Sequence, residues 1–209
     1  MIFNTAQSKD FTPRIRNSLG TEYENVENFK LLGVEFVTDA RKGLSFDTYI
    51  NKCIQKGYSN LWVLKRLSEF GVSIERLLET YKLRIRVFVE QNVPLWMYNI
   101  SQKMSNKIER LQKVALYILL GRNADKDYFV NLSMLDLDTL KDRRDKIAEK
   151  FAGKVLKHPQ HRKMFQFILS DRTRSGKKIL VPWARTQRYA RSTVPSLGRV
   201  INEKLYNKI

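Results

Sequence analysis

Cysteine and histidine are scarce in this sequence. Cys53 is the only cysteine, and the two histidines are His158 and His161. One cysteine excludes a disulfide framework within the chain, and its position on the apolar side of a predicted helix favours a small buried side chain. The histidines have the i, i+3 spacing of helical zinc ligands, but Pro159 lies between them and no cysteine or further histidine completes a site. The pattern therefore favours neither a zinc site nor Cys-His catalysis.

Long apolar runs are also missing. No run approaches the 18 or so residues that a membrane-spanning helix needs. The N-terminal residues Met1-Ile2-Phe3-Asn4 are followed by polar residues, without the basic start and apolar core of a signal peptide. We therefore expect a soluble intracellular protein, in the nucleus or the cytoplasm, that has no membrane partner.

Acidic residues are few compared with basic ones. The chain has 21 Asp and Glu against 39 Lys and Arg, which gives a net charge of +18. A charge of this size repels itself and predicts a polyanionic partner, with nucleic acid as the leading candidate. The 43% of hydrophobic residues and 11% of aromatic residues are typical of a globular chain, and 209 residues allow one domain with an appendage or two small domains.

The hydrophobic periodicity divides the chain into a short β segment and a long helical one. Met1–Phe3 and the run Phe29–Val37 contain β-forming residues and are predicted to be the two strands of a small N-terminal β-hairpin within residues 1–40, with turn-forming residues at Asn17–Gly20 between them. The apolar spacing then changes to about 3.6 residues, which predicts a bundle of about four helices over residues 41–157. Residues 158–209 are predicted to be a basic, partly ordered C-terminal tail. The predicted fold class is therefore mainly α.

Capping residues and glycines predict where the helices begin and end. A mobile polar link is expected at Arg122–Lys126, and Asp136 and Asp138 are interpreted as acids that suit a helix start rather than as metal ligands. The predicted helices are Phe46–Phe70 closed by Gly71, a second one after Ser73 that Pro94 breaks, a third from Ser101 to Gly121, a fourth from near Asp138, and short ones near Met164–Leu169 and Leu197–Leu205.

Three groups of basic residues are candidates for binding nucleic acid. The first recurs at steps of three or four residues, so it forms a continuous stripe along the third predicted helix. The third group is interleaved with Trp183 and Tyr189, whose rings could stack on unpaired bases. The groups are Lys103, Lys107, Arg110 and Lys113; Lys52, Lys56, Lys65 and Arg66; and Arg185, Arg188 and Arg191.

Several short motifs occur in a fixed order along the chain. In order and spacing they resemble the C-terminal part of the reverse transcriptase, an RNA-directed DNA polymerase, of non-LTR (LINE-like) retrotransposons. The matched region runs from the last palm strands through the thumb to the C-terminal extension. The motifs are Met1-Ile2-Phe3-Asn4, Lys30-Leu31-Leu32-Gly33-Val34, Ile50–Leu67, Val93-Pro94-Leu95-Trp96, Ile108–Leu116, Leu135–Arg144 and Tyr189-Ala190-Arg191-Ser192-Thr193-Val194-Pro195.

This resemblance implies a role in holding template and primer. Leu32 and Gly33 correspond to the primer grip, and the helices correspond to a thumb that binds RNA, DNA or an RNA–DNA hybrid by its backbone. The family's catalytic carboxylates, which hold Mg²⁺ in a Tyr/Phe-x-Asp-Asp turn and at a further Asp, would precede Met1. The resemblance therefore implies no catalytic residue and no cofactor in this chain, and a catalytic palm as a further partner.

Two other functions remain open at the level of sequence. The chain could be a stand-alone basic helical protein that coats RNA or DNA and has no polymerase role. It could also be a helical scaffold whose charge serves an acidic protein partner. The binding of nucleic acid and its salt dependence separate the second alternative from the others.

Overall fold

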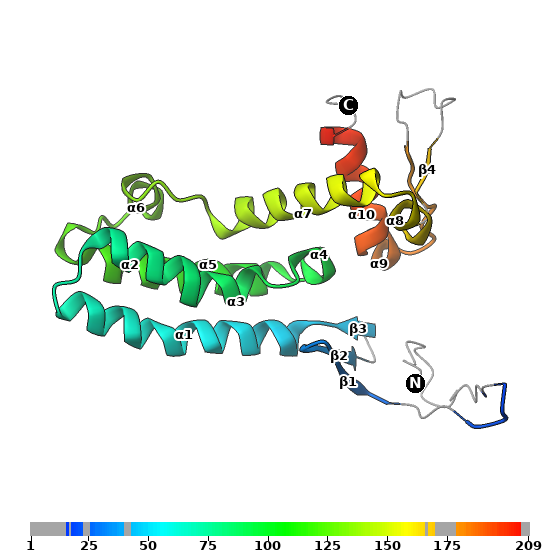
Figure 1. Ribbon diagram of the computed structural model, residues 1–209, viewed down its shortest axis with the longest axis horizontal. Helices are drawn as coiled ribbons and strands as arrows, with labels where there is room; N and C mark the ends of the chain where they lie inside the picture. The colour runs from blue at the N-terminus through cyan, green and yellow to red at the C-terminus, as the bar shows by residue number, and fades with distance from the viewer. Residues whose placement is uncertain are drawn as a thin grey trace. The chain divides into compact units, whose positions relative to one another are not determined.

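The computed structural model describes residues 16, 18–22, 26–39, 43–165, 167–169 and 179–205 (Figure 1). The described part is mainly helical, with a small antiparallel sheet near its N-terminus, which confirms the predicted fold class. The chain forms two compact units, residues 1–55 and 56–209. The predicted strand at Met1–Phe3 lies outside the described residues. Within the described ranges, no helix is both long and apolar enough to cross a membrane.

The N-terminal unit contains a three-stranded antiparallel sheet in the order β1-β2-β3, formed by β1 (Asn28–Leu31), β2 (Val34–Asp39) and β3 (Gly43–Ser45). The prediction of a single strand over Phe29–Val37 is wrong, because the run is itself a hairpin in which Phe29 pairs with Phe36 and Leu31 with Val34. Its two-residue turn has positive φ at both Leu32 (48°) and Gly33 (82°), the pattern of a type I′ turn. Glycine suits this conformation, whereas leucine adopts it at a steric cost.

Helix α1 (Asp47–Glu69) has nearly the predicted bounds and continues from the N-terminal unit into the C-terminal one. Gly71 has a φ of +72°, and its N–H together with that of Val72 closes the end of the helix, as predicted. At Gly57, an added Cβ would lie only 2.5 Å from a methyl carbon of Leu111. A larger residue at position 57 would therefore force the buried Leu111 side chain to shift.

The next helical segment contains a π-helical turn. It consists of α2 (Ile74–Tyr81), the π-helix η1 (Lys82–Arg86) and α3 (Val87–Glu90), with Ser73 at the predicted N-cap position. The segment ends before Asn92, and Pro94 lies in the first turn of the short helix α4 (Val93–Trp96), where no N–H is needed. Tyr81, Ile85, Val89 and Trp96 are buried, so this segment contributes to the core of the C-terminal unit.

Helix α5 (Gln102–Leu120) begins and ends where the sequence predicts. The Ser101 hydroxyl accepts a hydrogen bond from the Met104 N–H, and Gly121 (φ +53°) closes the other end. The 3₁₀ turn η2 (Gly121–Asn123), α6 (Tyr128–Met134) and α7 (Leu140–Lys157) follow. Helix α6 was not predicted, because seven residues are too short for a hydrophobic period to stand out.

The described part of the C-terminal tail is folded. It contains α8 (Pro159–Met164), the strand pair β4 (Ile168–Leu169) and β5 (Ile179–Leu180), α9 (Gln187–Ala190), α10 (Thr193–Val200) and the π-helix η3 (Ile201–Leu205). The helix predicted near Met164–Leu169 is wrong, because α8 ends at Met164 and β4 follows it. The buried core of this segment is Ala152 and Val155 of α7 with Phe167, Ile179, Leu197 and Ile201.

Candidate nucleic-acid interface

The predicted basic stripe lies on the exposed face of α5. Lys103, Lys107, Arg110 and Lys113 are all exposed, and they cover about 120° of the helix surface. Among the described residues, Lys103 and Arg110 have no acidic partner within ion-pair distance. The opposite face of α5 is buried in the core of the C-terminal unit through Met104, Ile108, Leu111 and Ala115. The stripe is therefore held on a helix that is fixed by packing.

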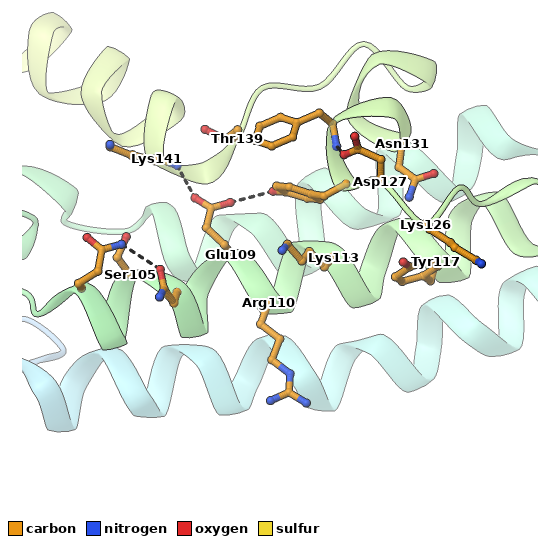
Figure 2. A pocket seen from close by; sticks show the side chains of 14 residues that line it. Ser105, Glu109, Arg110, Lys113, Tyr117, Lys126, Asp127, Asn131, Thr139 and Lys141 are labelled. Carbon is orange, nitrogen blue, oxygen red and sulfur yellow. Dashed lines mark hydrogen bonds between the residues drawn. The ribbon is translucent and has the colours of Figure 1, made fainter.

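An open groove of about 900 Å³ lies beside the stripe, between α5, α6 and the start of α7 (Figure 2). Arg110 and Lys113 of the stripe belong to its lining, so the two features are continuous. The Lys113 ammonium lies 4.9 Å from the centre of the Tyr128 ring, within cation–π distance. The other basic and aromatic residues of the lining are Tyr117, Lys126, Phe129 and Lys141.

Glu109 joins the three helices around the groove. One carboxylate oxygen accepts hydrogen bonds from the Tyr128 hydroxyl (2.8 Å) and the Leu140 N–H (3.3 Å), and the other accepts from the Lys141 N–H (2.7 Å). A carboxylate at this position satisfies free N–H groups of the α7 N-terminus and interacts favourably with the helix dipole. Burial raises the pKa of the Tyr128 hydroxyl, and its hydrogen bond to Glu109 raises this pKa further. The negative charge of Glu109 is thus engaged by the protein itself.

The loop before α6 is held by side-chain hydrogen bonds. The buried Asn131 amide bonds both the N–H (2.8 Å) and the carbonyl (2.9 Å) of Asp125. The Asp127 carboxylate caps α6 by accepting from the Phe129 N–H at 2.8 Å. The link predicted to be mobile at Arg122–Lys126 is therefore tied to α6, and Lys126 has a defined position at the groove.

Buried polar contacts fix α5 to α2 and α7. The Tyr81 hydroxyl donates to Gln112 Oε1 (2.7 Å), and Gln112 Nε2 donates to the Asp138 carbonyl (2.9 Å). Arg144 of α7 is almost fully buried and donates to the Ser105 hydroxyl at 2.7 Å. Burial raises the pKa of Tyr81 and lowers that of Arg144. These contacts hold α2, α5 and α7 in one arrangement.

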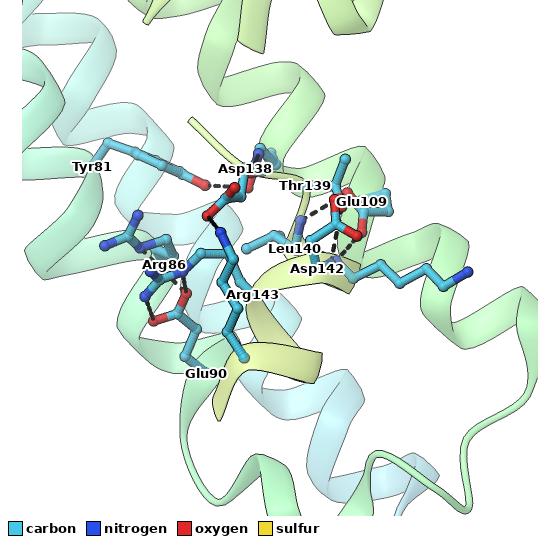
Figure 3. A network of polar contacts seen from close by, with 12 residues as sticks. Tyr81, Arg86, Glu90, Glu109, Asp138, Thr139, Leu140, Asp142 and Arg143 are labelled. Atoms are coloured by element: carbon cyan, nitrogen blue, oxygen red, sulfur yellow. Dashed lines mark hydrogen bonds and ion pairs between the residues drawn. The ribbon is translucent and has the colours of Figure 1, made fainter. Parts of the chain in front are cut away.

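A second polar cluster links α7 to α3 (Figure 3). Arg143 makes a bidentate ion pair with Glu90, with N–O distances of 2.7 and 3.0 Å. The hydrogen bonds that Arg143 donates to Glu90 raise the pKa of Arg143 above its ordinary value. Arg86 lies 3.4 Å from the same carboxylate. Glu90 therefore pairs with two arginines at once, and its single negative charge offsets only one of their two positive charges.

The two acids predicted to lie at the start of the fourth helix precede α7 but do not supply its N-cap. The N-cap of α7 is Thr139, whose hydroxyl accepts from the Asp142 N–H. Asp138 precedes the cap and forms an ion pair with Lys146 at 2.6 Å, and the hydrogen bond from Lys146 lowers the pKa of the Asp138 carboxyl. Asp136 occupies a turn with a φ of +49°. Among the described residues, no three His, Cys, Asp or Glu side chains form a group that could hold a metal ion.

The two predicted site residues of the hairpin lie at its tip, and a third lies near the sheet. Leu32 is 94% exposed, and Gly33 follows it in the turn. Lys52 of α1 pairs with Glu35 of β2 at 2.5 Å. Within the N-terminal unit, Leu32 is therefore open to solvent, whereas the charge of Lys52 is engaged by Glu35.

The remaining candidates on α1 do not form one surface. Lys56 and Lys65 are nine residues apart, which places them about half a turn from each other around the helix. Lys65 and Arg66 both pair with Glu69, at 4.0 and 3.1 Å. The charge of this group is therefore divided between two sides of the helix and partly balanced.

The arginines of the C-terminal segment lie around α9. Arg185 and Arg191 are exposed, as are Trp183 and Tyr189, while the side chain of Arg188 is outside the described part of the structure. Among the candidates on α1 and near α9 whose side chains the structure describes, none lines the groove beside α5. Of the predicted site residues whose side chains are described, Arg110 and Lys113 line the groove, which places them beside further basic and aromatic side chains.

Sequence reasoning missed one set of groove residues and a second basic row that lies outside the groove. The first is the groove lining from α6 and the adjacent loops, which comes together only in the tertiary structure. The second could have been found from its spacing, because it repeats the i, i+4, i+7 pattern of Lys103, Lys107 and Arg110. It consists of the exposed α7 residues Lys150, Lys154 and Lys157.

Comparison with known proteins gives no relative for this chain: no family model matches it, and no curated protein or solved structure matches it significantly. The resemblance to reverse transcriptases therefore rests on the sequence motifs described above.

Proposed function

We propose that this chain binds the backbone of a nucleic-acid duplex through α5, as the template–primer-holding part of a reverse transcriptase of the non-LTR type. The observation that carries the proposal is the row of four exposed cations, Lys103, Lys107, Arg110 and Lys113, on a helix whose other face is buried. Such a row of cations can bind phosphate groups along one strand without contacting the edges of the bases. Binding through it is expected to be independent of sequence and strongly dependent on salt.

The rigidity of α5 supports this function. The helix is capped by Ser101, closed by Gly121, tied to α2 through Gln112 and tied to α7 through Ser105. Its cations therefore stand on a backbone that needs little further ordering when a ligand binds, which lowers the entropic cost of binding. The same support makes α5 suited to holding a regular duplex.

The polymerase part of the proposal is supported by the order of the elements. The hairpin with the exposed tip residues Leu32 and Gly33 comes first, and the helical bundle with the basic stripe follows, as in the family that the motifs resemble. In this proposal Mg²⁺ and the catalytic carboxylates belong to a palm that precedes the matched region. The chain by itself is expected to bind a primed RNA template without adding nucleotides.

The binding test compares two matched triple variants. The α5 triple carries Lys103→Gln, Lys107→Gln and Arg110→Gln, and the α7 triple carries Lys150→Gln, Lys154→Gln and Lys157→Gln, with the same spacing and the same loss of charge. Affinity for a blunt RNA–DNA hybrid is measured by fluorescence anisotropy. The α5 triple is expected to bind at least about tenfold more weakly than the wild type, since three phosphate contacts are lost.

The α7 triple is expected to stay within about twofold of the wild type, because its lysines lie outside the proposed surface. Melting curves of both variants control for folding. Equal losses of affinity in the two triples would remove α5 from the proposal. Incorporation of nucleotides by the pure protein on a primed RNA template with Mg²⁺ would contradict a role limited to holding template and primer.

A further inference from the structure

The groove beside α5 exposes aromatic rings that the core does not use. Phe129 is 67% exposed and Tyr117 is 48% exposed, and both belong to the groove lining. In a duplex each base is covered on both faces by its neighbours, so exposed rings gain little from it. An unpaired base has a free face, and stacking on an aromatic side chain contributes about 1–3 kcal/mol per base. The rings therefore favour a single strand over a duplex in this groove.

The charges around these rings complement phosphate groups. Lys126 and Lys141 are exposed and lie at opposite ends of the groove in Figure 2. The lining contains two carboxylates, but Glu109 accepts from two backbone N–H groups of α7 and Asp127 accepts from the Phe129 N–H. Both acids are thus engaged within the protein, whereas the lysines face solvent. A ligand that carries phosphates at both sides of a stacked base fits this distribution.

The groove is also formed before a ligand binds. Asn131 holds the loop that carries Lys126, and Glu109 holds α6 through Tyr128. Its volume of about 900 Å³ lies near the upper end of the range for sites that hold small organic ligands, so there is room for a base with its sugar and phosphate. Little side-chain or loop ordering is required on binding.

We infer that this groove binds an unpaired extension of the duplex held by α5, with Tyr117 and Phe129 stacking on bases and Lys126 and Lys141 contacting phosphates. This inference rests on the proposed function, because Arg110 and Lys113 belong to both the stripe and the groove. It adds a substrate class, a duplex with a single-stranded end. The site distinguishes unpaired bases from paired ones and has no preference for a particular base sequence.

The experiment compares a blunt RNA–DNA hybrid with the same hybrid carrying a single-stranded overhang, as RNA and as DNA, with 2-aminopurine in the overhang. For the wild-type chain, the overhang is expected to tighten binding about fivefold or more. It is also expected to quench 2-aminopurine fluorescence through stacking. The variant Tyr117→Ala/Phe129→Ala is expected to lose both effects while its affinity for the blunt hybrid stays unchanged.

Phe70→Ala is the matched control, because Phe70 is an 81% exposed phenylalanine outside the groove. It is expected to keep the full effect of the overhang, and melting curves control for folding of every variant. If the blunt hybrid binds and the overhang adds nothing, or if Tyr117→Ala/Phe129→Ala keeps the gain, this inference is overturned and the proposed function stands. If the blunt hybrid does not bind, the proposed function fails, and an overhang that binds only with Tyr117 and Phe129 present would support the groove alone.

Discussion

Helices α5 and α7 carry cations with the same spacing in different surroundings. Each helix has three exposed basic residues at positions i, i+4 and i+7, and each is buried along its other face. Beside α5 lies a groove with exposed aromatic rings, whereas Lys150, Lys154 and Lys157 of α7 do not line that groove. The spacing of charges along a helix therefore does not define a binding site without the side chains that surround it.

The buried faces of the two helices differ as well. The α5 face packs within the helical bundle and is fixed by polar contacts to α2 and α7. The C-terminal half of α7 instead supplies Ala152 and Val155 to the core of the C-terminal segment, where they lie with Leu197 and Ile201. We interpret α7 as the support of that segment and α5 as the support of the binding surface. The following predictions test this division.

The largest effect is expected where α7 holds the C-terminal segment. Leu197 is fully buried in that core, so Leu197→Ala is expected to lower the free energy of unfolding by about 3 kcal/mol. Denaturation with urea measures the change. Leu180→Ala, at a partly exposed leucine of β5, serves as the control and is expected to cost less than about 1 kcal/mol. A loss below 1 kcal/mol for Leu197→Ala would mean that the segment does not depend on this core.

The next effect compares one carboxylate from each helix. Glu109→Gln weakens the cap of α7 and removes the charge 4.0 Å from the buried Arg144, so a loss of about 2 kcal/mol in the free energy of unfolding is expected. Glu149→Gln breaks only the more exposed pair with Lys204 and is expected to cost no more than about 0.5 kcal/mol. Chemical denaturation of both variants gives the difference. Equal losses would contradict the central place of Glu109.

A smaller effect is expected from single tyrosine hydroxyls. Tyr81→Phe removes the hydrogen bond to the buried Gln112 and is expected to cost about 1 kcal/mol of unfolding free energy. The Tyr98 hydroxyl is buried and has no hydrogen-bond partner in the described part of the chain, so Tyr98→Phe is expected to be neutral or slightly stabilising. Thermal melts of the two variants separate these outcomes. A larger loss for Tyr98→Phe would show that its hydroxyl has a partner that the structure does not contain.

The smallest effect is expected from alkaline pH on the α7 side. Burial raises the pKa of Tyr98, which packs beside the C-terminal core, from 10.0 to about 12. Between these values the unfolded chain has lost this proton and the folded chain keeps it, so the free energy of unfolding falls as pH rises. Tyr98→Phe is expected to reduce that fall by a few tenths of a kcal/mol, allowing for partial exposure. Denaturation at pH 9 and pH 11 measures it, and an unchanged fall would contradict the burial of this group.

The sequence predicted the parts of the fold that depend on local signals. The bounds of α1 and α5 followed from apolar spacing together with Gly71, Ser101 and Gly121, which act within a few residues of the helix ends. The segment near Met164 was predicted as helix, but Phe167 is buried in a core with Leu197, about thirty residues later in the chain. Contacts between residues so far apart in the sequence override the local helical propensity. No local sequence pattern indicates them.

For the candidate site, too, the sequence predicted the part that depends on local signals. The α5 stripe follows from the positions of four cations on one helix. The groove does not, because its aromatic and basic lining comes from α5, α6 and the start of α7 and depends on Glu109 to hold these elements together. A carboxylate within a basic helix gives no sign in the sequence that it caps another helix.

The salt dependence of duplex binding tests the central claim most directly. The slope of log affinity against log salt concentration is measured for the wild type, the α5 triple and the α7 triple with the same blunt hybrid. The account predicts that the slope of the α5 triple is less steep than that of the wild type by about 2.7, at roughly 0.9 for each of three phosphate contacts. The α7 triple should keep the wild-type slope. A flat slope for the wild type, or an equal reduction in both triples, would contradict binding of the backbone by α5.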